Sequence, residues 1–135
     1  MSINQYRKVQ SQSAITDASP HMLISMLFRG ALDNIAVARG AIERGQAALK
    51  GEKIGRAIDI IDNLRSSLDM SVGGEVAQNL KDLYDYMEGR LLTANMEDST
   101  AALEEVASLL GEIAQGWNAM PEEYKKAPSR HSEAG

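Results

Sequence analysis

Apolar residues recur at spacings of three and four through four successive stretches of this 135-residue chain. Such spacing places them on one side of an α-helix, which completes a turn every 3.6 residues. Aromatic residues make up only 4% of the chain, a composition that also favours helices over strands. The pattern predicts helices over residues 20–48, 53–71, 75–95 and 100–118, with core-facing side chains that include Ile35, Leu64, Val76, Leu80 and Leu110.

Residues that cap or end helices lie between these stretches. Ser19 can cap the first helix, and Pro20 suits its first turn, where a backbone N–H would have no helical partner in any case. Helices of about twenty residues joined by short turns must run antiparallel. The sequence therefore predicts an all-α, antiparallel up-down four-helix bundle over residues 19–120. Glycines mark the other boundaries: the first helix can end near Gly45, Gly51 marks the first turn, and Gly73 and Gly74 mark the second. Ser99 or Thr100 can cap the last helix, and Pro121 ends it.

The two ends of the chain have a different composition. Residues 1–18 carry Ile3, Tyr6 and Ile15 among Gln, Ser and Asn. These are too few apolar side chains for a core, but enough to lie reversibly over a groove, so two interpretations remain: a mobile groove cap and a frayed terminus. Residues 121–135 contain almost nothing apolar, and we expect a disordered tail.

Charge and cysteine content exclude several classes of protein. The formal net charge is −5, and the basic residues are scattered among acids, which argues against a nucleic-acid partner. With no cysteine there is no disulfide, thiolate nucleophile or cysteine-type zinc site. No stretch resembles a secretory signal or a membrane-spanning segment. We therefore expect a cytoplasmic protein without stable membrane insertion.

The sequence offers little for catalysis or metal binding. Four-helix bundles often hold metals through Glu-x-x-His pairs, but the two histidines, His21 and His131, have no carboxylate at that spacing. Glu104 and Glu105 point about 100° apart on a helix and cannot oppose each other across one cleft. We predict no catalytic, cofactor or metal site, and hence no enzyme, although a small helical enzyme is the alternative that metal analysis would detect.

Some apolar residues are left over once each helix has its core face. Each of them alone can pack under a loop, but together they suggest grooves for a further amphipathic helix, and methionine adapts to such grooves. With the N-terminal apolar residues, they form the predicted protein-binding set: Ile3, Tyr6, Ile15, Met22, Met26, Val37, Ile60, Met70 and Leu92.

Several short motifs follow one another in a definite order along the chain. After Tyr6 comes Ala18-Ser19-Pro20, then LFRGAL at residues 27–32 and IIDNLRSSLD at residues 60–69. The Gly-Gly turn leads into EVAQNLKDLYDYMEGRLLTAN, and LEEVASLLGEIAQGW ends at Trp117. This order of motifs, over about residues 6–117, resembles the FliS family of flagellin-specific export chaperones. The chain departs from the family in two places: Phe28 and Arg29 replace the usual tyrosine and acid, and residues 114–116 lack the usual arginine or similar side chain.

The resemblance implies a bundle that binds the disordered C-terminal region of flagellin in the cytoplasm. Such a chaperone prevents premature polymerisation and helps deliver flagellin to the flagellar type III export gate, whose components are further partners. It also implies that the segment bearing Tyr6 lies near the binding groove and moves when the client arrives. An alternative is a regulatory adaptor that binds an export component or a flagellar regulator through the same surfaces.

Overall fold

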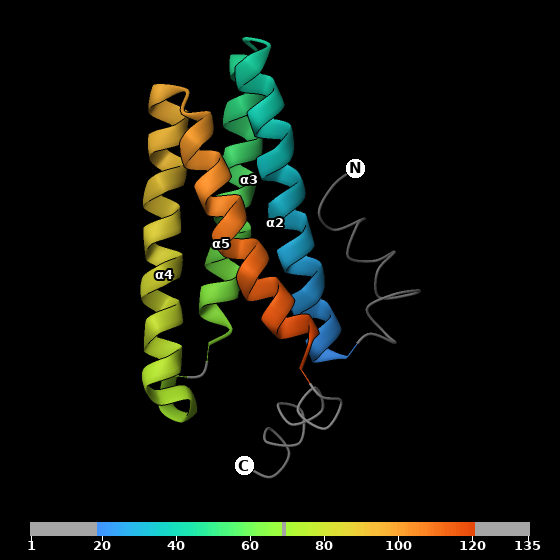
Figure 1. Cartoon of the computed structure of the whole chain (residues 1–135), viewed down its shortest axis with the longest axis vertical. Coiled ribbons are helices and arrows are strands. Elements are labelled where there is room, and N and C mark those ends of the chain that lie inside the picture. Colours follow the sequence, from blue (N-terminus) through green and yellow to red (C-terminus); the bar gives the residue numbers. More distant parts are fainter. Residues whose placement is uncertain (1–18, 69, 121–135) are drawn as a thin grey trace.

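The computed structural model describes residues 19–68 and 70–120 as four helices, labelled α2 (Pro20–Glu43), α3 (Ala47–Ser66), α4 (Met70–Glu97) and α5 (Thr100–Asn118). Successive helices run in opposite directions, and α5 crosses the bundle obliquely to return to α2 (Figure 1). Each helix packs against its neighbours in sequence, and α5 also packs against α2. The predicted all-α, antiparallel four-helix bundle is confirmed. The predicted N-terminal cap and C-terminal tail lie outside the described residues.

Serine side chains cap the N-termini of two of the helices, α2 and α5. The Ser19 hydroxyl accepts a hydrogen bond from the Met22 N–H at 3.1 Å, and Pro20 follows it in the first helical turn. The Ser99 hydroxyl accepts from the Ala102 N–H, also at 3.1 Å. Each bond satisfies a backbone donor that the helix itself leaves without a partner.

The first turn lies six residues earlier than the sequence predicted. Helix α2 ends at Glu43, Gly45 adopts a left-handed φ of 69°, and α3 begins at Ala47. The prediction that Gly51 marks this turn was wrong, because Gly51 lies inside α3. Glycine can close a helix where φ is positive, and a glycine in a helix interior costs only about 1 kcal/mol, which packing can offset.

The second turn also differs from the prediction. Helix α3 ends at Ser66 and α4 begins at Met70, but Gly74 breaks α4 with φ 55° and ψ −129°, a conformation open essentially only to glycine. A Cβ on Gly73 would lie 2.4 Å from the Ala77 Cβ. The break resets the helical phase, so Ala77 is buried while Val76 is 68% exposed, and the assignment of Val76 to the core was wrong.

The core combines large aliphatic side chains with alanines at the helix seams. Alanines at positions 31, 38, 57, 94 and 102 have no exposed surface, which allows the helix backbones to approach closely. Leu80 packs against this core but is only partly buried. The largest fully buried side chains are those of Ile54, Ile61, Leu64, Met87, Leu91, Leu103, Val106 and Leu110.

Candidate protein-binding site

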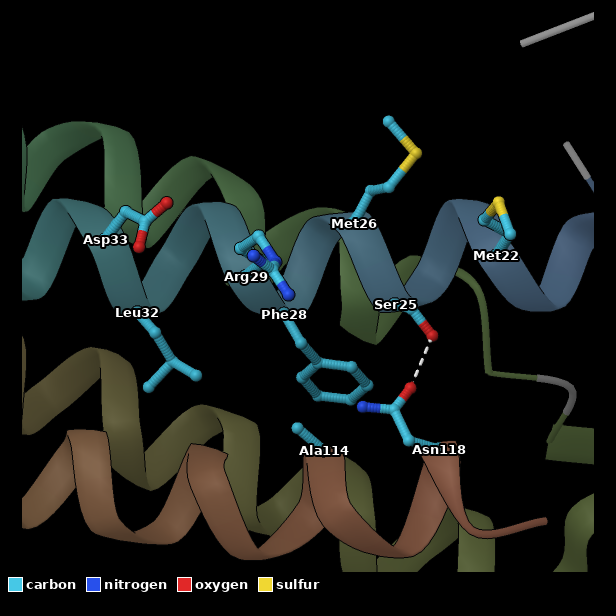
Figure 2. Close-up of a pocket in the computed structure, with 9 residues that line it drawn as sticks. All are labelled: Met22, Ser25, Met26, Phe28, Arg29, Leu32, Asp33, Ala114 and Asn118. Carbon is cyan, nitrogen blue, oxygen red and sulfur yellow. Dashed lines mark hydrogen bonds between the residues drawn. The ribbon is translucent and has the colours of Figure 1, made fainter. Parts of the chain in front are cut away.

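A hollow of about 410 Å³ lies along the seam between α2 and α5 (Figure 2). The Phe28 ring is buried and points from α2 toward Ala114 of α5, and Leu32 points the same way. Met22 and Met26 project from the outer side of α2. The Met22 side chain is 54% exposed, an unusually open position for a large apolar group. The hollow thus has an apolar floor and a methionine rim.

A second hollow of about 380 Å³ continues along the same seam and shares Leu32 with the first. Its floor includes Ile35 and Leu103, which belong to the core. The Arg39 guanidinium crosses from α2 to the Glu104 carboxylate at 3.1 Å. We call the two hollows together the α2–α5 groove. Its lining residues extend along α2 from Met22 to Glu43.

Polar contacts fasten the two helices at the methionine end of this groove. The His21 Nε2 donates to the Trp117 carbonyl oxygen at 2.7 Å, and the Trp117 Nε1 donates to the His21 carbonyl oxygen at 3.0 Å. The two rings stack with centroids 4.6 Å apart. Beside them, the Ser25 hydroxyl donates to the Asn118 side-chain oxygen at 2.7 Å (Figure 2). His21 is therefore a structural residue that sets the spacing of α2 and α5.

Two residues of the predicted binding set line the groove, Met22 and Met26. Val37 is exposed on α2, but it is not among the residues that line either hollow. Leu92 is exposed on α4, which does not line the groove. Ile60 packs against the core, where its Cδ1 would lie 3.3 Å from a Cβ placed on Gly30 of α2.

The other members of the set cannot be placed. Ile3, Tyr6 and Ile15 lie outside the described residues, and the structure describes no side chain for Met70 at the start of α4. Conversely, the sequence did not point to Arg29, Leu32 or Asn118 as groove residues. The signal for Asn118 is topological: in an antiparallel four-helix bundle the end of the fourth helix lies beside the start of the first.

A charged cluster joins α3 to α4, away from the groove. The Arg65 guanidinium of α3 forms ion pairs with Asp62 on its own helix and with Asp85 and Glu88 of α4, the latter at 3.1 Å. Burial and the neighbouring Asp62 raise the pKa of Glu88 to about 7. Hydrogen bonds from Lys81 and Arg65 lower the pKa of Asp85. Glu88 is therefore a carboxyl group that titrates near neutral pH inside a helix interface.

The described residues offer neither a metal site nor a membrane-spanning helix. Within residues 19–68 and 70–120, no three His, Cys, Asp or Glu side chains are arranged so that they could hold a metal ion. None of the four helices in this part of the chain is long and apolar enough to cross a membrane.

Comparison with known proteins gives a consistent result. The family model described as flagellar protein FliS matches residues 2–124. The flagellar secretion chaperone FliSB of Pseudomonas aeruginosa is 47% identical over 116 residues, covering 86% of this chain and 92% of the relative. The flagellar secretion chaperone FliS of Salmonella typhimurium is 49% identical, covering 85% and 86%. That of Vibrio cholerae is 38% identical, covering 91% and 90%.

Proposed function

Because this chain belongs to the FliS family of flagellar proteins, we propose that it is a cytoplasmic export chaperone for flagellin. It binds the disordered C-terminal region of flagellin, prevents premature polymerisation and helps deliver flagellin to the type III export gate. The names of the relatives support the chaperone role. The observation that carries the binding role is the α2–α5 groove, with its apolar floor and a methionine rim in which Met22 is exposed.

The chemistry of the groove suits coupled folding and binding. A disordered client segment loses chain entropy when it orders, so it must bury a large apolar area in return. The two hollows, of about 410 and 380 Å³, provide a continuous apolar floor around Phe28, Leu32 and Ile35. The methionines at the rim adapt their shape to different apolar side chains. The groove thus supplies binding surface rather than reactive groups.

The N-terminal segment is the proposed cap of the empty groove. Residues 1–18 directly precede Ser19, the N-cap of α2, and Met22 at the end of the groove follows Ser19 by three residues. A segment attached so closely has a high effective concentration at this site. We propose that Ile3, Tyr6 and Ile15 cover the groove until a client displaces them.

Isothermal titration calorimetry with a peptide from the C-terminal region of flagellin tests the proposal. We expect a complex at micromolar concentrations, with a negative heat-capacity change from apolar burial. A peptide from the N-terminal region of flagellin is the matched control and should not bind. No binding of the C-terminal peptide at tens of micromolar would contradict the proposal. Capture of a flagellar regulator instead of flagellin would favour the adaptor alternative.

A further inference from the structure

The rim of the α2–α5 groove carries one arginine that is not engaged by an acid. Arg29 lines the first hollow and is exposed. Among the described residues, no carboxylate oxygen lies within ion-pair distance of its guanidinium, although Asp33 is one helical turn away on the same groove. By contrast, Arg39, Arg56, Arg65 and Arg90 each form an ion pair with a carboxylate.

The neighbouring hollow has an excess of negative charge, with Glu43 and Glu104 beside Arg39, whereas Arg29 and Asp33 balance each other in the first hollow. Arg39 is held at 3.1 Å by Glu104 and at 3.7 Å by Glu43, so two carboxylates surround one guanidinium. The positive charge offered to a client therefore lies at the methionine end of the groove, at Arg29. A carboxylate placed there gains an attractive pair, whereas the same carboxylate near Glu43 and Glu104 meets repulsion.

We propose that Arg29 selects client segments that place an acidic side chain beside the apolar residues covering the methionine rim, and so fixes the register of the client. This inference rests on the proposed chaperone function. Arg29 follows Met26 by three residues, about 4.5 Å along the helix axis, and follows Met22 by two turns. A client helix lying along α2 would therefore carry its acid about one turn beyond the apolar residue that contacts Met26.

Charge reversal at Arg29 tests the inference. Binding of the flagellin C-terminal peptide is measured for the wild-type chain and for the variants Arg29→Glu, Arg29→Gln and Arg56→Glu. Arg56 is the matched control, because it is exposed on α3 outside the groove and its reversal changes the net charge equally. Circular dichroism establishes that each variant is folded.

We expect Arg29→Glu to weaken binding on the order of tenfold at low salt, with Arg29→Gln intermediate and Arg56→Glu within about twofold of wild type. The effect should shrink as salt screens the pair. Peptides in which each acidic residue in turn is replaced by lysine should include one that binds Arg29→Glu better than it binds wild type. If Arg29→Glu and Arg56→Glu bind equally well, the inference is overturned while the chaperone proposal stands. If wild type itself does not bind the peptide, both fail.

Discussion

Replacing Glu88 with glutamine should make the bundle more stable above neutral pH. In the folded chain the pKa of Glu88 is raised to about 7 by burial and by Asp62, whereas in the unfolded chain it returns to its ordinary value of 4.5. The folded state therefore binds the proton more tightly than the unfolded state. The contribution of Glu88 to the free energy of unfolding is therefore fully present below pH 4.5 and is lost as the pH rises through about 7.

The size of the effect follows from the pKa shift. A shift of one unit corresponds to 1.36 kcal/mol, so the full shift sets an upper limit of about 3 kcal/mol. The Glu88 side chain keeps 19% of its surface exposed and is paired with Arg65, so solvent and partner reduce the effect. Glutamine stays neutral and can donate to the Asp62 carboxylate. We expect Glu88→Gln to stabilise the fold by about 1–2 kcal/mol at pH 8 and to change it little at pH 5.

Urea unfolding followed by circular dichroism between pH 5 and pH 8 measures this difference. Glu112→Gln is the control, because it removes the same charge from an exposed position of α5. Because Glu112 lies on α5, this substitution removes no charge from the α3–α4 interface. A stability difference between Glu88→Gln and wild type that does not change across this pH range, or a glutamine variant that is less stable at pH 8, would refute this role of Glu88.

Four other substitutions test the packing and the groove. Leu64→Ala should lower the free energy of unfolding by about 2–5 kcal/mol in urea titrations, since Leu64 is only 1% exposed. Gly74→Ala should cost about 1–3 kcal/mol in the same assay, because alanine is strained at φ 55° and ψ −129°. Trp117→Phe keeps an aromatic side chain but replaces the indole and removes its hydrogen bond to the His21 carbonyl, so thermal unfolding should show a loss of at least about 1 kcal/mol. Met22→Asp should weaken binding of the flagellin C-terminal peptide in calorimetry while leaving the melting temperature almost unchanged, and a collapse of that temperature would place Met22 in the core.

The number and direction of the helices followed from the sequence because they depend on local periodicity. Apolar spacing placed Ile35, Leu64 and Leu110 on core faces, and all three are buried. Turn positions were less certain, since Gly45 and Gly51 both offer a place to end a helix. The choice between them depends on packing against the rest of the bundle, which local propensity does not contain.

The groove could be predicted only in part. Met22 and Met26 were identified from the sequence because they lie off the predicted core face of their helix, and both line the groove. The contact between His21 and Trp117 joins residues 96 positions apart and has no local signature. The floor of the groove depends on the lateral distance between α2 and α5, and that distance is set by such contacts. Leu92, like Met22, was left over from a core face in the sequence, yet it lies on α4, which does not line the groove.

Hydrogen exchange of the whole chain, with and without the flagellin C-terminal peptide, tests most directly whether the α2–α5 groove is the client site. Exchange reports the local protection of backbone amides, so it locates a bound segment without any substitution. We expect the new protection to concentrate in α2 around Met22–Leu32 and in the facing part of α5, with little change on the outer surfaces of α3 and α4. Protection on α3 and α4 with none along α2 and α5, in a sample where the complex has formed, would contradict the assignment of the groove.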